Sequence, residues 1–518
     1  MKIENEKLQY LFSIIKATVV DALEKLNEYN DNNSYCPKYY KYPHPFWQRI
    51  KQTDTYGQLI LKCPQIKYGV EEYDMNTYDN PNNYEELFGL KDDKFRINIT
   101  NSNKFNELCE FFNKNNDIVE IMYGNTKEIQ YKTCKFIAQI VNRLMYIGQE
   151  EKEIDKLIVY KLRRYFNEKL SINICVPINF ILFSEEKIEL ADNITIERIP
   201  DEMQISRFYF SQYDSKSENN VLQNCAYMII LKNYTFDNDN NSALESLKKN
   251  YWAYPIEKID DILVSIRIVT GLDIGYSQIL MQPINWVDDT CTDMVPIYGT
   301  TIRAFNRKFT DMGFIQYEYA MINTIASEKI KNVYNFIINV RNKDVEQQEK
   351  LKLQKTKTKF RNNRYSYNKE IPYNKIFIAI KKLNKCMLRE EDDDMALEAI
   401  IGIETLLSDS QSALKYTMSN RLAIISSQID ECNYNPDEMR KAMKYMYSLR
   451  SRIVHGEYVE EKDKIVKVGT NIVQFKNLAI EFLRYSLLFI LSNEEYLNPA
   501  CFEKLLDNLL IKAKKNML

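Results

Sequence analysis

The sequence predicts a mainly α-helical multidomain protein of the α+β class, with a mixed α/β middle region and a C-terminal helical bundle. At 518 residues, the chain exceeds the usual size of a single hydrophobic core. Its middle part alternates β-branched residues between turn signals, and its last part repeats apolar residues at helical spacing. We expect three domains, at residues 1–150, 151–365 and 366–518.

The N-terminal region is expected to be mostly helical. Amphipathic patterns predict helices at residues 8–26 and 105–112, and a third at 154–170 opens the next region. The stretch 29–45 is rich in Asn, Tyr and Pro and is expected to be a loop. No motif in the first 150 residues indicates a fold type.

The middle region is expected to combine strands with a helix. A helical pattern covers residues 256–270. Runs rich in β-branched residues predict strands at residues 172–176, 187–190, 194–197, 225–236 and 279–295.

A basic run ends the middle region, and two interpretations of it stay open. Between Lys350 and Arg364 every charged residue is positive. Such a polar run usually forms a solvated linker or loop, because it buries too little apolar surface to order. The alternative is contact with the RNA backbone, because clustered Lys and Arg displace counterions from phosphates. In that case the RNA-binding residues are Lys355, Lys357, Lys359, Arg361 and Arg364.

The chain after Pro372 is expected to form a compact bundle of five helices. The acidic run 390–394 stands where the second helix begins, and carboxylates there face the positive helix end. We interpret this run as helix capping, with a metal site as the alternative. Apolar residues at helical spacing predict the five helices at residues 376–388, 395–407, 414–426, 438–454 and 472–491.

Composition disfavours several kinds of chemistry. With 70 basic and 72 acidic residues, no global field recruits nucleic acid or an anionic membrane. The absence of GxxxxGK[ST] and GxGxxG motifs disfavours nucleotide-dependent chemistry. His44 and His455 are the only histidines, which excludes a zinc site with several imidazoles from one chain. We therefore expect neither a metal nor a cofactor.

Cysteine usage and hydropathy indicate a cytoplasmic protein. The ten cysteines include no CxxC pair, and the N-terminus lacks a signal-peptide pattern, which favours reduced thiols. The most apolar stretch near the C-terminus, residues 478–491, carries Glu481 and Arg484 and is too short to cross a bilayer. We expect cytoplasmic localisation and no membrane partner.

The most informative stretch ends the fourth predicted helix of the bundle and reads Leu-Arg-Ser-Arg-Ile-Val-His-Gly at residues 449–456. Gly456 is a natural helix stop, which puts His455 in the last turn, where the negative helix end favours imidazolium. The guanidinium groups of Arg450 and Arg452 match phosphate oxygens and stabilise negative charge. An imidazole and guanidinium groups are the groups that metal-free phosphodiester cleavage uses. Helix capping and surface charge also explain the Arg-x4-His spacing when it is considered alone.

Glu404 is a candidate for supporting this site. It follows Ile400 and Ile401 by four and three residues, so its carboxylate stands against an apolar stripe and needs a partner if buried. One interpretation is a structural pair with a basic residue such as Arg421 or Arg440. The other is support for an active-site arginine.

Four blocks of the C-terminal region, in this order, resemble the ApeA-like branch of the HEPN superfamily. The resemblance covers roughly residues 370–515 and is most specific in the last block. The strand-rich region from Ser171 is similar to the segment that often precedes such domains. The four blocks are residues 376–388, 396–407, 420–423 and 449–456.

The resemblance implies a bundle that dimerises so that two Arg-x4-His motifs face each other in one ribonuclease site. It assigns Arg450 and His455 as catalytic residues and Ser451 as the polar residue after the arginine, and it needs no metal. In such enzymes the ribose 2′-hydroxyl attacks the neighbouring phosphate and leaves a cyclic phosphate. Because His44 is far away in sequence, acid and base histidines at one site would require His455 from both chains.

Two functions stay open. The first is a metal-independent endoribonuclease cleaving tRNA or mRNA, an antiphage or abortive-infection toxin held inactive until a phage-derived trigger releases it. The second is a non-catalytic HEPN module for dimerisation or RNA binding, in which Arg450 and His455 brace the bundle. Both imply RNA and a second copy of the chain as partners, in a homodimer or higher oligomer. A weaker third possibility is sensing of a small ligand by the middle region, for which the sequence has no motif.

Overall fold

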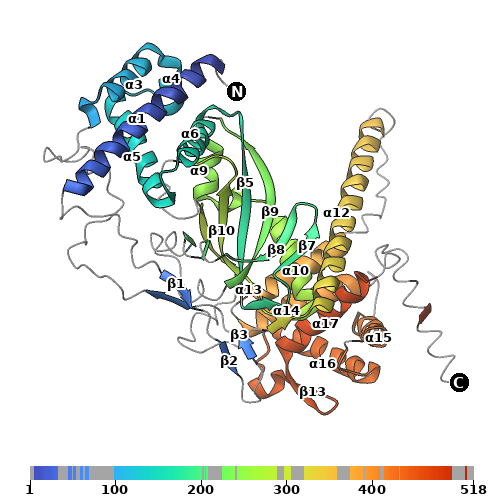
Figure 1. Cartoon of the computed structure of the whole chain (residues 1–518). Coiled ribbons are helices and arrows are strands. Elements are labelled where there is room, and N and C mark those ends of the chain that lie inside the picture. The colour runs from blue at the N-terminus through green and yellow to red at the C-terminus, as the bar shows by residue number, and fades with distance from the viewer. Residues whose placement is uncertain are drawn as a thin grey trace. The chain divides into compact units, whose positions relative to one another are not determined.

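The computed structural model confirms a mainly helical protein of the α+β class (Figure 1). It describes residues 5–32, 45–48, 51–53, 59–61, 65–68, 99–200, 203–204, 206–207, 225–239, 242–288, 297–304, 320–358, 374–389, 391–408, 414–430, 432–492, 504 and 508–509. The chain forms two compact units, each assembled from segments distant in sequence. Unit 1 contains residues 1–177, 198–254 and 278–302, and unit 2 contains residues 178–197, 255–277 and 303–518.

A helical core opens unit 1. Apolar faces of its helices bury residues such as Leu11, Phe112 and Ile137 in one cluster. Ser102 begins one of the helices, because its hydroxyl accepts a hydrogen bond from the Lys104 backbone N–H. The helices of this core are α1 (Asn5–Asn32), α3 (Asn103–Lys114), α4 (Asn116–Tyr123), α5 (Ile129–Ile147) and α6 (Glu151–Phe166).

Six strands are hydrogen-bonded in the order β11-β10-β5-β9-β8-β7. Among the other strands, β1 (Pro45–Gln48) pairs antiparallel with β4 (Gln65–Tyr68), and β2 (Lys51–Thr53) pairs antiparallel with β3 (Leu59–Leu61). Strand β12 (Ala320–Ile322) runs parallel to β6 (Ile181–Phe183). The strands of the six-stranded sheet are β5 (Lys169–Asn179), β7 (Lys187–Ala191), β8 (Ile194–Arg198), β9 (Cys225–Asp237), β10 (Tyr276–Pro283) and β11 (Tyr298–Ala304).

Most sequence-predicted elements of these regions are confirmed, with errors at their ends. The strand predicted at 279–295 is wrong at residues 284–288, because β10 ends at Pro283 and proline has no N–H to extend the ladder; residues 289–295 lie outside the described residues. The helix predicted at 154–170 ends at Phe166, and Leu170 already belongs to β5. The loop predicted from Tyr29 is wrong as far as Asn32, where α1 ends, since no Gly or Pro interrupts that helix; residues 33–44 lie outside the described residues.

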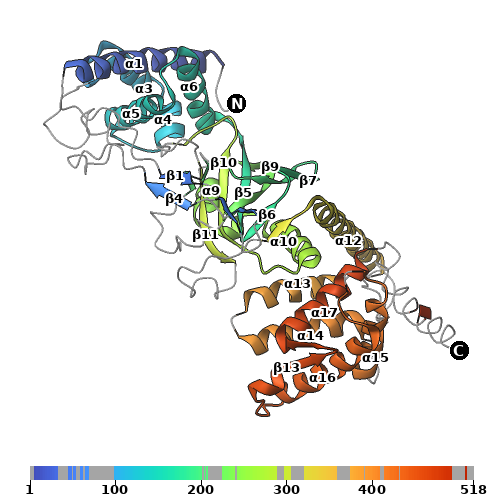
Figure 2. The same ribbon diagram turned by 60° about the horizontal axis from the view of Figure 1, so that its bottom comes forward.

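The helices of unit 2 share one hydrophobic core, which also includes Val264 of α10 (Ile256–Thr270) and Ile337 of α12 (Thr324–Thr358). Figure 2 shows α13, α14 and α17 lying side by side in this bundle, and α14 packs against both of the other two. The remaining helices of the bundle are α13 (Asn374–Leu388), α14 (Asp392–Leu407), α15 (Leu414–Ser426), α16 (Pro436–Val454) and α17 (Phe475–Ile490).

Helix α12 corrects the prediction of a linker or loop in the basic run. Residues 350–358 continue this helix to its end at Thr358. Lys, Gln and Leu are strong helix formers and the segment lacks Gly and Pro, so helix propensity favours its continuation. Residues 359–364 lie outside the described residues.

The final helix of the bundle also begins later than predicted. Residues 472–474 belong to a hairpin of β13 (Ile465–Val468) and β14 (Asn471–Gln474), and α17 starts at Phe475. Strand β13 buries Val466 and Val468 in alternation, a strand signal that the sequence prediction missed. Gly469 makes the turn with φ +61°, and a Cβ there would collide with the Glu438 carboxylate.

The charged residues of the apolar stretch 478–491 have specific partners in unit 2. The Arg484 guanidinium donates to the Ile268 carbonyl at the end of α10 (3.2 Å). The Glu481 carboxylate accepts hydrogen bonds from the hydroxyls of Tyr434 (2.9 Å) and Tyr485 (2.8 Å). None of the helices in the described part of the chain is long and apolar enough to span a bilayer.

A group of charges lies between α10 and α12. Arg341 donates two hydrogen bonds to the carboxylate of Asp261, which is 1% exposed. Next to it, burial raises the pKa of Asp260 to about 6, against an ordinary value of 3.8, although Arg267 and Arg341 oppose the shift. Keeping Asp260 ionised therefore costs folding free energy at neutral pH.

Replacing Asp260 with Asn is expected to stabilise unit 2 at neutral pH. The folded pKa lies above the unfolded one, so the wild type has its full stability below pH 3.8 and loses part of it as the pH rises through about 6. We expect the gain in unfolding free energy of Asp260→Asn to be about 2 kcal/mol larger at pH 7.5 than at pH 4. Urea denaturation at both pH values measures this difference, and an equal effect at both would contradict the assignment.

Candidate functional site

The candidate site begins at the C-terminal end of α16. A capping box starts this helix: Asn435 accepts from the Glu438 N–H (2.9 Å), and the Glu438 side chain accepts from the Asn435 N–H (3.0 Å). At the other end, Glu457 N–H donates to Arg452 C=O (3.0 Å) and Gly456 N–H donates to Ile453 C=O (3.1 Å). This pair of bonds is the Schellman closure, and it requires the left-handed φ of +75° found at Gly456.

His455 is the C-cap residue of α16 rather than part of its last turn. Its backbone N–H donates to the Ser451 carbonyl (3.0 Å), and its side chain is exposed. The exposed carbonyl end of the helix gives this position a negative local potential. An accessible imidazole at such a helix end is able to exchange protons with a bound substrate.

Arg450 is half-buried and paired with Glu404 of α14. Its Nη2 lies 3.5 Å from Glu404 Oε2, and both side chains are about a quarter exposed, at 25% and 23%. Its guanidinium carbon stands 5.9 Å from the centre of the Tyr447 ring. The buried Nε–H of Arg450 has no acceptor among the described residues. Glu404 and Tyr447 thus orient the guanidinium, and a quarter of the Arg450 side chain remains exposed.

Glu404 pairs with Arg450, the arginine of the motif, and this pair fits both interpretations: a structural pair with a basic residue and support for an active-site arginine. The basic residues named for a structural pair have other contacts: Arg421 donates to the Leu407 carbonyl (3.1 Å) and Arg440 donates to Asp437 (2.6 Å). The Arg450 pair connects two helices, α14 and α16, that are distant in sequence.

Arg450 and His455 are on different faces of the same helix end. At about 100° per residue, five residues rotate the side-chain direction by roughly 140°. Ser451 and Arg452 are closer in direction to His455, at roughly 40° and 60°. Each copy of the chain thus offers its histidine and its arginine in different directions around α16.

Arg452 stabilises the segment that follows α16. Its guanidinium contacts the Asp463 carboxylate (3.3 Å), the Tyr458 carbonyl (3.3 Å) and the Glu457 carboxylate (3.4 Å). These contacts fasten the segment after Gly456, including the 3-10 turn Glu461–Lys464, to the end of α16. Sequence spacing alone did not distinguish Arg452 from Arg450.

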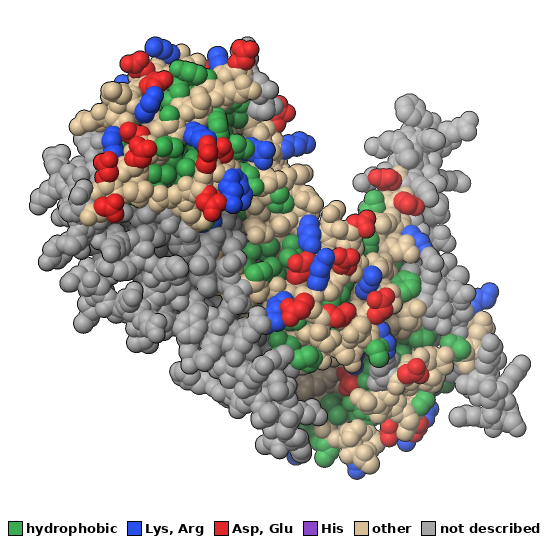
Figure 3. Space-filling view, in the orientation of Figure 1, with side chains coloured by type: hydrophobic (Ala, Val, Ile, Leu, Met, Phe, Trp, Pro, Cys, Tyr) green, Lys and Arg blue, Asp and Glu red, His purple; other side chains and the backbone are tan. Residues whose placement is uncertain are grey.

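The predicted RNA-binding residues lie in another helix or outside the described residues. Lys355 and Lys357 lie in the last turns of α12, while Lys359, Arg361 and Arg364 are outside the described residues, as is the other histidine, His44. On the face drawn in Figure 3, basic and acidic side chains are interspersed over the described surface.

The acidic residues at the start of α14 pair with lysines. Asp392 contacts Lys476 (2.6 Å) and Asp393 contacts Lys464 (2.9 Å), and the N-cap residue Glu391 makes no side-chain capping bond. They stand in the first turn of α14, near its positive end, but the capping bond that the sequence predicts for this run is not formed at the N-cap. Among the described residues no group of three or more His, Cys, Asp or Glu side chains is arranged to hold a metal ion.

Comparisons of the chain with protein-family models, with curated proteins and with solved structures find no match.

Changing Gly456 tests the closure that positions His455. A Cβ there would have open space, so Gly456→Ala should cost only backbone strain, about 1 kcal/mol of unfolding free energy. Gly456→Asn should cost less, because asparagine tolerates the left-handed region. Urea denaturation of the three proteins measures both effects. Equal stability of the wild type and Gly456→Ala would contradict the closure.

Proposed function

We propose that the protein is a metal-independent endoribonuclease whose site is built from Arg450 and His455. The observation that carries the proposal is the position of Arg450, which lies beside Glu404 and Tyr447 and keeps a quarter of its side chain exposed. An exposed imidazole follows on the same helix end. The C-terminal sequence resemblance to HEPN ribonucleases supports the same assignment.

The proposed reaction needs one base, one acid and a stabiliser of phosphate charge. The 2′-hydroxyl oxygen forms a bond to phosphorus and loses its proton to a base, and the bond from phosphorus to the 5′-oxygen breaks as that oxygen takes a proton from an acid. The products are a 2′,3′-cyclic phosphate and a 5′-hydroxyl. The Arg450 guanidinium would bind the phosphoryl oxygens, whose negative charge increases in the transition state.

A second copy of the chain supplies the second imidazole in this proposal. His44 is far from His455 in sequence, so the second imidazole at one phosphate would be His455 of a second, facing copy. The substrate is RNA, such as tRNA or mRNA, in the cytoplasm. In line with the resemblance, we propose a role in antiphage defence, with other parts of the chain restraining the site until a trigger arrives.

A non-catalytic bundle is the second candidate function, and the Arg450–Glu404 pair favours it. A half-buried ion pair that joins α14 to α16 would brace the bundle without any chemistry. The two functions differ in the role of His455. In the ribonuclease it takes part in proton transfer, whereas in a non-catalytic bundle this exposed side chain adds little to stability.

Single substitutions should separate these functions. We expect His455→Ala to lower RNA cleavage by at least roughly 100-fold with unchanged melting, because a general acid or base contributes that much. Arg450→Ala should also abolish cleavage. Arg440→Ala is the matched control, an exposed arginine of α16 paired with Asp437, and should cleave like the wild type.

The measurement is cleavage of a labelled RNA by purified protein, with and without EDTA and with analysis of the product ends. Cyclic phosphate ends in the presence of EDTA are expected. Equal RNA breakdown by the wild type and His455→Ala, or its loss in EDTA, would contradict the proposal.

A further inference from the structure

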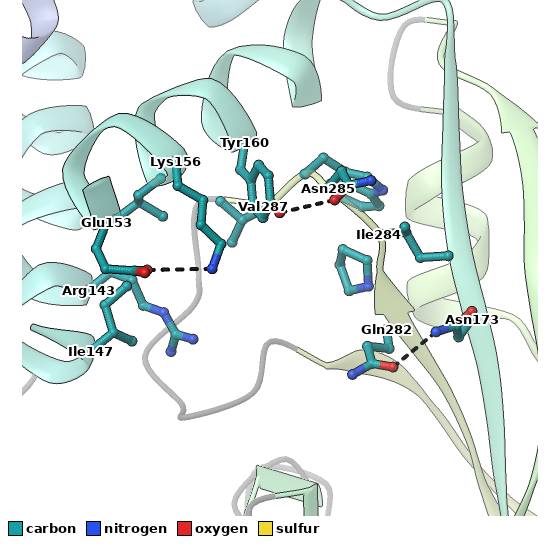
Figure 4. Close-up of a pocket in the computed structure, with 13 residues that line it drawn as sticks. Arg143, Ile147, Glu153, Lys156, Tyr160, Asn173, Gln282, Ile284, Asn285 and Val287 are labelled. Carbon is teal, nitrogen blue, oxygen red and sulfur yellow. Dashed lines mark hydrogen bonds and ion pairs between the residues drawn. The ribbon is translucent and has the colours of Figure 1, made fainter. Parts of the chain in front are cut away.

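Unit 1 contains a cavity, whereas the α16 site belongs to unit 2. Helices α5 and α6 form one side of it, and strands β5 and β10 with the loop 284–287 form the other (Figure 4). Its volume of about 520 Å³ lies within the range of small-molecule sites, roughly 300–1,000 Å³. All residues that line it belong to unit 1.

The charged side chains of the cavity favour an anion. Arg143 of α5 lines it and is only 8% exposed. Lys156 of α6 also lines it, and its Nζ lies 3.5 Å from a carboxylate oxygen of Glu153, a long contact that an incoming anion can replace. Two cations and one carboxylate leave a net positive lining. A nearly buried guanidinium in that setting binds phosphate or carboxylate in two-pronged geometry.

The cavity also offers a flat apolar face. The Tyr160 ring lines it, and its hydroxyl donates to Asn285 Oδ1 (3.0 Å), which fixes the ring (Figure 4). Asn285 itself has φ +59°, a left-handed conformation that non-glycine residues rarely adopt and that occurs often at ligand sites. Trp286 closes the wall, held by its Nε1–H bond to the Ser171 carbonyl (2.7 Å).

Side-chain amides line the opposite strand side. Asn173 Nδ2 donates to Gln282 Oε1 (3.2 Å), which orients the Gln282 amide. The amide nitrogen of Gln282 has two N–H donors, the kind of group that reads a carbonyl or ring nitrogen on a heterocycle. In Figure 4 both amides extend from their strands on the side across from Arg143 and Lys156.

We propose that this cavity binds a nucleoside phosphate: the phosphate contacts Arg143 and Lys156, the base stacks on Tyr160, and the Gln282 amide reads its edge. The sequence has no motif for this site, because the residues that line it come from separate segments of the chain. The proposal does not rest on ribonuclease activity, since Arg450 and His455 belong to unit 2.

Calorimetry on the full chain tests the proposal, with AMP, GMP, CMP and UMP titrated one at a time. We expect at least one to bind with a Kd below about 1 mM. Inorganic phosphate and the matching nucleoside should each bind at least roughly 10-fold more weakly, because each lacks one of the two contacts. His455→Ala should bind like the wild type, which separates this cavity from the α16 site.

Substitutions of residues that line the cavity test whether the ligand binds there. Lys156→Gln and Tyr160→Leu should each weaken binding at least roughly 10-fold, the loss of about 1.4 kcal/mol. Lys152→Gln is the matched control, an exposed lysine of the same helix outside the cavity, and should not change the Kd. Arg143 is nearly buried, so Arg143→Gln is compared only if its melting temperature equals that of the wild type. Lys156 is exposed, so Lys156→Gln tests the site without this condition. Binding of none of the four nucleotides, or equal binding by Lys156→Gln, Tyr160→Leu and the wild type, would overturn the proposal.

Discussion

The packing of α14 at the centre of the bundle is the constraint on which the candidate site depends. This helix contacts α13, α15, α16 and α17. Gly402 permits its close approach to α17, since a Cβ there would come within 2.8 Å of the Leu483 side chain. Two residues further on, Glu404 reaches Arg450 of α16. The orientation of the motif arginine therefore follows from the tight packing of the core.

The two arginines of the motif region have different tasks because of this arrangement. Arg452 uses its donors on Asp463, Glu457 and the Tyr458 carbonyl, so it organises the chain after the helix. Arg450 has one long ion pair and an aromatic neighbour, and a quarter of its side chain is exposed. In the proposed function Arg452 is therefore the structural arginine, and Arg450 is the one that would bind phosphate.

Periodicity predicted the bundle well where one face of a helix is buried. Helix α15 has its predicted bounds, and α13, α14 and α16 begin only two or three residues earlier than predicted. The hairpin at Ile465–Gln474 was missed because its two strands are short and sit against an apolar helical pattern. The end of α12 was missed because that segment is polar, whereas its first part has an apolar stripe, with Ile330, Val333 and Ile337 buried, that the sequence prediction missed. Neither the Glu404–Arg450 pair nor the cavity beside Tyr160 follows from local spacing, because tertiary packing brings those residues together.

The central claim is that two chains share one site, and mixed protomers test it most directly. Wild-type and His455→Ala proteins are mixed in equal amounts and allowed to exchange subunits before RNA cleavage is measured. A shared site that needs both histidines predicts that exchange lowers the activity of the mixture to roughly half, because only about a quarter of the dimers then keep two copies of His455. Activity that does not change on mixing, with subunit exchange demonstrated, would contradict it.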